Sequence, residues 1–119
     1  AEHLIGTVNG DIFSSPDGLW FDSQGRLWIQ TDYGDDDAQN ANMGTNQMLC
    51  ADPKTREVKR FMAGPRGCEV TGVTATPDGK AMWVNIQHPG LSYPASDRKT
   101  RARSTTVLIT MADGGVVGT

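Results

Sequence analysis

The chain has few cysteines, no long hydrophobic run and no excess of basic residues. Its 119 residues include two cysteines, Cys50 and Cys68, which are too few for a disulfide framework and are either buried unpaired thiols or one mutual disulfide. No apolar segment approaches the roughly 20 residues that span a bilayer, and the start of the chain does not read as a signal peptide. The net charge of −3 argues against a nucleic-acid partner, which needs a basic stripe.

Helical periodicity is also missing, whereas short alternating segments bounded by turn residues recur along the chain. Hydrophobic residues make up 37% and charged residues 21%, a composition typical of a globular domain. We therefore predict an all-β fold. The predicted strands are 19–22, 26–31, 46–51, 57–62, 72–76, 80–85 and 105–111.

These strands fall into two similar halves. Residues 18–26 match residues 72–80 in pattern, and each segment is followed by a Trp-bearing strand, a long polar loop, a third strand and a candidate fourth. Repeats of four short strands are typical of β-propeller blades, and the alternative is a coincidental likeness between two hairpins. We predict two four-stranded antiparallel blades, approximately at 12–63 and 69–119, in one β-rich unit covering 1–119.

Two blades cannot close a propeller, because about four to eight are usual. The chain is therefore expected to be a fragment of a larger propeller. Since the flat faces of its blades would be left without neighbours, we also predict self-association of the isolated chain.

Three acidic residues stand next to predicted strand ends, where a propeller directs side chains toward its central channel. Asp17 and Glu69 precede the first strand of each repeat, and Asp32 follows the second strand of the first repeat. Carboxylates that converge there suit hard cations, which take oxygen ligands. Asp17 also fits an ordinary turn at 15–18, and Asp32 also fits a loop cap. The acidic run at 35–37 is typical of a solvated loop and lacks EF-hand spacing.

Two basic features complete the set of candidates. His88 follows the strand predicted at 80–85 and is either a metal or phosphate ligand or a hydrogen-bonded scaffold residue. A solvated loop explains most of the basic cluster before the last strand. Arg103 is the member of this cluster nearest that strand, and its planar guanidinium suits bidentate contact with phosphate. The cluster comprises Arg98, Lys99, Arg101 and Arg103.

Residues 64–72, Gly-Pro-Arg-Gly-Cys-Glu-Val-Thr-Gly, form the most informative motif. Its glycines permit a tight turn and close approach of the backbone to a ligand. The motif places Glu69 at the start of a blade, and we leave Arg66 out of the predicted site because it can pair with a nearby carboxylate.

The motif belongs to a set of five that occur in one order along the chain: 15–19, 27–32, 46–49, 64–72 and 85–90. The first alone is unspecific, because calcium-dependent lactonases with propeller folds carry something similar. The last two, including Asn-Ile-Gln-His-Pro-Gly, form a specific pair. Across roughly residues 12–111, the chain closely resembles the C-terminal part of PhoX-type alkaline phosphatases.

The resemblance implies a six-bladed propeller, exported by the twin-arginine route to the periplasm or beyond, that hydrolyses phosphomonoesters with iron and calcium. It implies Asp17, Asp32 and Glu69 as metal ligands and Arg103 as a phosphate contact in catalysis. Neither cysteine is assigned to the iron. Because these enzymes are several times longer, we expect the isolated chain to be inactive. The alternatives are a piece of a calcium-dependent lactonase-like propeller and a non-catalytic β-propeller interaction module.

Overall fold

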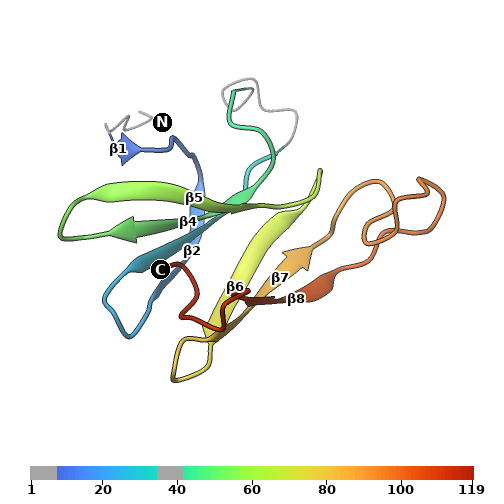
Figure 1. The fold of residues 1–119 in the computed structure, drawn as a ribbon. Coiled ribbons are helices and arrows are strands. Elements are labelled where there is room, and N and C mark those ends of the chain that lie inside the picture. The colour runs from blue at the N-terminus through green and yellow to red at the C-terminus, as the bar shows by residue number, and fades with distance from the viewer. Residues whose placement is uncertain (1–7, 35–41) are drawn as a thin grey trace.

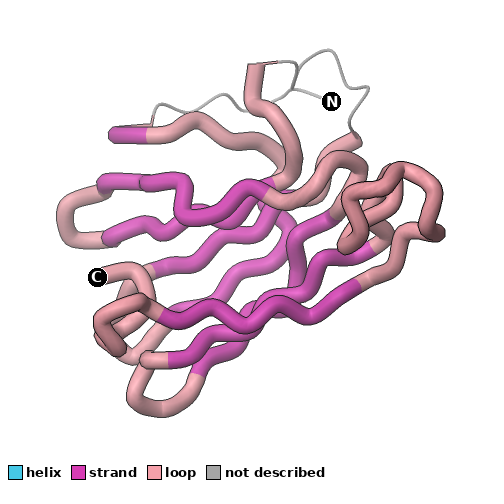
Figure 2. Tube along the Cα trace, turned by 45° about the vertical axis from the view of Figure 1, so that its right-hand side comes forward, coloured by secondary structure: helices cyan, strands magenta, loops and turns pink. Residues whose placement is uncertain are grey.

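The computed structural model describes residues 8–34 and 42–119 and confirms the all-β prediction (Figure 1). Figure 2 shows these two ranges as strands joined by loops and turns, with no helix. Accordingly, no helix able to cross a membrane is found in the described part of the chain. The acidic run at 35–37 lies outside the described residues.

The strands form two sheets. The larger has the order β1-β5-β4-β3-β2 and the smaller has the order β6-β7-β8. All neighbouring strands are antiparallel except β1, which pairs parallel with β5. The strands are β1 (Asn9–Gly10), β2 (Pro16–Phe21), β3 (Leu27–Thr31), β4 (Gln47–Asp52), β5 (Glu57–Ala63), β6 (Glu69–Ala75), β7 (Ala81–Gln87) and β8 (Thr105–Thr110).

The seven predicted strands are present, and β1 was not predicted. The fourth strand expected in the second half is not formed, because the smaller sheet has three strands. The segment after β8 turns at Gly114, whose φ is +72°, and then inserts Val117 into the core with 1% of its surface exposed. The Val117 amide donates one hydrogen bond to the carbonyl of Gly79, which fixes the segment without a strand ladder.

Two strands begin earlier than predicted, so Asp17 and Glu69 lie within strands rather than before them. Asp17 belongs to β2 because Pro16 already pairs with Thr31, across a bulge that precedes Gly18. Glu69 is the first residue of β6 and pairs with Gln87. The turn expected at 15–18 is therefore mostly bulged strand.

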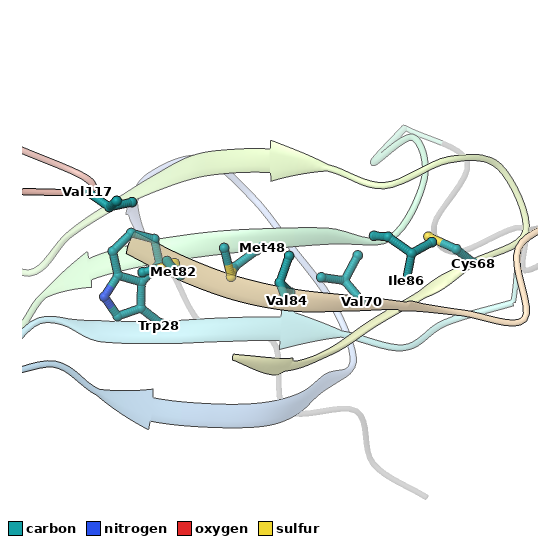
Figure 3. Packing of buried hydrophobic residues seen from close by; sticks show 8 residues of the cluster. All are labelled: Trp28, Met48, Cys68, Val70, Met82, Val84, Ile86 and Val117. Carbon is teal, nitrogen blue, oxygen red and sulfur yellow. The ribbon is translucent and has the colours of Figure 1, made fainter. Parts of the chain in front are cut away.

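The main core lies between the two sheets, where β6 packs against β2, β3 and β4. β7 shows the expected period of two, since Met82, Val84 and Ile86 are buried while the residues between them are less so. Figure 3 shows these side chains meeting Trp28 and Met48 of the larger sheet. A smaller cluster on the other face of the larger sheet contains Ile29, Leu49 and Val58.

Cys50 and Cys68 form no disulfide with each other, so the second of the two predicted readings is wrong. Cys68 is buried in the main core, whereas Cys50 is half-buried. Burial raises the pKa of the Cys50 thiol and so disfavours its thiolate.

Asp22 organises the end of the β2–β3 hairpin that lies away from Asp32. Its carboxylate accepts hydrogen bonds from the side chains of Arg26, at 2.7 Å, and Trp28, at 3.0 Å. Burial raises the pKa of Asp22, but hydrogen bonds from Trp28 and Arg26 outweigh that effect and hold the pKa below its usual value. Arg26 in turn donates to the carbonyls of Val117 and Gly118, which secures the C-terminal segment.

Candidate metal centre

The strand order brings one end of each of three strands together. Asp32 directly follows β3, His88 directly follows β7, and Glu69 begins β6. Since β6 and β7 are antiparallel and Glu69 pairs with Gln87, the start of β6 lies beside the end of β7. β3, in the larger sheet, packs against β6. Asp32, which follows β3, therefore lies near Glu69 and His88.

The three side chains form a compact cluster of potential ligands. One ligand atom from each of Asp32, Glu69 and His88 lies within 4.8 Å of the other two. The Glu69 side chain is 10% exposed and sits at the base of the cluster, while Asp32 and His88 are exposed. A cation bound here would therefore be held from the protein side and remain open to solvent or a substrate.

The His88 ring is oriented from both of its nitrogens. Nδ1 lies 3.3 Å from the carbonyl oxygen of Gly67, and Nε2 lies 3.3 Å from Oε2 of Glu69. A neutral ring that donates from Nδ1 to Gly67 carries its lone pair on Nε2, which then faces a carboxylate acceptor. A cation between the Nε2 lone pair and the Glu69 carboxylate would satisfy both acceptors. Metal-binding histidines usually donate their other ring N–H to a group such as a backbone carbonyl, as Nδ1 would do here. The donor set thus fits a metal ion.

The backbone of His88 is also held in an uncommon conformation. Its φ is +34°, in the left-handed region that non-glycine residues seldom occupy. Its amide donates to Oγ of Ser104 at 3.1 Å, which connects the ring's position to the loop before β8. Backbone strain of this kind, which costs about 1–3 kcal/mol, is found preferentially at functional sites.

The two specific sequence motifs, 64–72 and 85–90, pack directly against each other. The Gly90 amide donates to the carbonyl of Arg66 at 2.8 Å, and a Cβ added at Gly90 would lie 2.9 Å from that oxygen. His88 contacts Gly67 and Glu69 from the same side. Glycine at position 90 thus permits the close approach that places the imidazole beside the carboxylate.

The predicted site residues are distributed unequally around this cluster. The structure brings Asp32 and Glu69 together and leaves Asp17 outside the group. Asp17 is exposed on β2, two residues after Ser15, whose carbonyl accepts a hydrogen bond from the Asp32 amide at 3.1 Å. Arg103 is exposed in the loop before β8, next to Ser104.

His88 completes the cluster, although the sequence left its role open between ligand and scaffold. The signal was its position after a strand, the same position that made Asp32 a candidate. Asn46, which is buried beside the cluster, is a further residue of the site that the sequence did not predict. Its side-chain hydrogen bonds to described residues span 13 to 22 positions of sequence, so no local pattern indicated them.

Comparisons with known proteins identify the family to which this chain belongs. Residues 2–90 match the family model described as Alkaline phosphatase PhoX. A solved structure, Pseudomonas fluorescens PhoX in complex with vanadate, a transition state analogue, is 51% identical and superposes with a TM-score of 0.84. The alignment covers 91% of this chain and 20% of that protein, so the chain spans about a fifth of its relative's length. None of the curated proteins matches. The chain belongs to the PhoX alkaline phosphatase family and is made of blades of its propeller fold.

Proposed function

We propose that this chain forms part of the active site of a longer metal-dependent phosphomonoesterase, with Asp32, Glu69 and His88 as ligands of one cation. The convergence of these three side chains from two sheets is the observation that supports the proposal most directly. The bound vanadate of the Pseudomonas fluorescens relative supports phosphoryl chemistry, because vanadate imitates the five-coordinate phosphorus of that reaction.

The donor set favours iron over calcium at this position. Calcium takes about six to eight oxygen ligands, whereas the cluster mixes two carboxylates with an imidazole. Imidazole together with carboxylate suits iron. Asp17, which offers only oxygen atoms and lies on β2, the strand that pairs with β3, is our candidate ligand for a calcium ion.

Three side chains of this chain are then assigned roles in the reaction. Glu69 would hold the cation from its buried side, and His88, whose ring contacts the carbonyl of Gly67, would hold it from the loop side. When bound, the cation would supply positive charge that neutralises phosphate oxygens and polarises the phosphorus. Arg103 binds and orients the phosphomonoester through its guanidinium, since Ser104 beside it contacts the backbone of His88.

We infer from the family that the whole enzyme is exported to the periplasm or beyond. The two alternative functions are not favoured, because both comparisons find PhoX. A lactonase-like propeller would hydrolyse a lactone instead. The function of a non-catalytic module would not change when the side chains of Asp32, Glu69 and His88 are replaced.

The test is Glu69→Gln in the longer phosphatase that carries this chain. The substitution keeps the shape but removes the charge of the buried ligand, so we expect phosphatase activity to fall by at least the roughly 10–100-fold that follows loss of a group that only orients a metal ligand. The matched control is Glu57→Gln, because Glu57 is half-exposed on β5 and its carboxylate forms an ion pair only with Lys59 among the described residues. Full activity of Glu69→Gln would refute the proposed centre.

The 119-residue chain alone should show no turnover of a chromogenic phosphomonoester, since most of the relative's length is absent from it. Metal-dependent turnover by the chain alone would contradict this expectation. Hydrolysis of a lactone by the longer protein would favour the lactonase alternative.

A further inference from the structure

Asn46 lies immediately before β4 and is 2% exposed. Its Oδ1 accepts hydrogen bonds from Oγ1 of Thr31 at 2.8 Å and from the amide of Tyr33 at 3.0 Å. Its Nδ2 donates to the carbonyls of Tyr33, at 2.8 Å, and Cys68, at 2.9 Å. Both lone pairs of the oxygen and both hydrogens of the nitrogen are therefore used. The orientation of the amide follows from its partners, because a backbone N–H only donates and a carbonyl only accepts.

These four hydrogen bonds involve three residues, and all three flank the two carboxylates of the candidate metal centre in sequence. Thr31 and Tyr33 are the residues on either side of Asp32, at the end of β3 in the larger sheet. Cys68 precedes Glu69, so the carbonyl that Asn46 binds belongs to the peptide group joined to Glu69. One buried side chain thus holds the backbone next to both ligands, although they come from different sheets.

The backbone of Asn46 adds a fifth contact to the same junction. Its carbonyl accepts a hydrogen bond from the amide of Gly64 at 2.7 Å, at the start of the motif that leads to Glu69. The preceding residue, Thr45, donates from its hydroxyl to the carbonyl of Gly64, also at 2.7 Å. The segment before Glu69 is therefore fixed to the start of β4 at two points.

We propose that Asn46 is a positioning residue that sets the separation of Asp32 and Glu69 and so determines the affinity of the centre for its cation. The proposal rests on the proposed function, because it takes Asp32 and Glu69 to be ligands. Asparagine suits the role because the site requires two acceptor positions and two donors on one short side chain. Aspartate at this position would lose both donors and bury a charge near two carboxylates.

The experiment is a titration of the 119-residue chain with Co²⁺, followed by its visible absorption and compared with the melting temperature of each variant. Asn46→Ala should raise the Co²⁺ dissociation constant by about 10–100-fold, the usual effect of removing a group that orients metal ligands. The control is Ile29→Val, which removes a methylene from the separate apolar cluster. It should lower the melting temperature and leave the dissociation constant unchanged.

A second pair of variants decides the matter if Asn46→Ala fails to fold. Thr31→Val removes one donor to Asn46, and Thr31→Ser keeps the hydroxyl. We expect weaker Co²⁺ binding for Thr31→Val and recovery of binding for Thr31→Ser. Equal binding by all three Thr31 forms would overturn the proposal.

The remaining outcomes distinguish the positioning role of Asn46 from the existence of the metal centre. If Asn46→Ala melts earlier but binds Co²⁺ as tightly as the original chain, Asn46 is only structural and the positioning role is wrong, while the metal centre stands. If the original chain binds no Co²⁺, the metal centre itself is wrong and the positioning role falls with it.

Discussion

Gly64→Ala is the sharpest test of how tightly the junction beside the candidate metal centre is packed. A Cβ added at Gly64 would lie 2.4 Å from Sγ of Cys68, 2.9 Å from Cγ2 of Val70 and 3.1 Å from the carbonyl oxygen of Asn46. Ordinary contact begins at about 3.4 Å, so the methyl group would overlap three neighbours at once. Two of these neighbours flank Glu69 in sequence.

The expected cost follows from how little these neighbours can move. Cys68 is 2% exposed and Val70 is fully buried in the core between the sheets, so neither side chain has free space to enter. Overpacking of such a site costs about 1–3 kcal/mol. For a chain of this length, a loss of that size lowers the melting temperature by roughly 4–12 °C.

The assay is thermal unfolding followed by circular dichroism, with Gly34→Ala as the matched control. No described atom lies within 4 Å of a Cβ added at Gly34, and its φ is not positive. That variant should melt at the same temperature as the original chain or slightly above it, because alanine restricts the unfolded state. If Gly64→Ala also melts within about 1 °C of the original chain, the junction is not packed as described.

Two further predictions concern pH and association. Because the pKa of Asp22 is lowered in the folded state, its stabilising effect is complete above the unfolded pKa near 4 and is lost as pH falls through the lower folded value. Asp22→Asn should therefore destabilise the chain by about 1–3 kcal/mol at pH 7 and flatten this acid dependence in urea unfolding, whereas an unchanged acid dependence would contradict the role of Asp22. The isolated chain should self-associate through β2, an edge strand on which Leu19 and Phe21 are 62% and 60% exposed. Replacing both by Lys should yield a monomer by light scattering, and a monomeric original chain at high concentration would refute the prediction.

Features set by neighbouring residues could be predicted from the sequence. The turn at Ser23-Gln24-Gly25 depends on a glycine with a φ of +79° and on a hydrogen bond from its amide to the carbonyl of Asp22, both local requirements. Alternation of apolar and polar residues gave the strands on either side. The predicted fourth strand was wrong because Val116 and Val117 have a strand-like composition, yet Val117 is buried as a single anchor.

The candidate site was predictable only in part, because its contacts join residues far apart in sequence. Asp32 and Glu69 were suggested by their positions at strand ends. The contact of Glu69 with His88 depends on the register of β6 against β7, which no local pattern determines. Asn46 reaches Cys68, 22 positions away, through a buried hydrogen bond.

The geometry of the candidate metal centre depends on the packing of the core between the sheets. Asp32 directly follows a strand of the larger sheet, whereas Glu69 begins and His88 directly follows strands of the smaller one, so the distance between ligands depends on how the sheets pack. A cation held by all three residues would connect the sheets at one end, while Trp28 and Val84 connect them within the core. A ligand that binds only the folded form stabilises it by about 2.7 kcal/mol at one hundred times its dissociation constant. Binding at this cluster would therefore strengthen the same contact between sheets that keeps the ligands within 4.8 Å of one another.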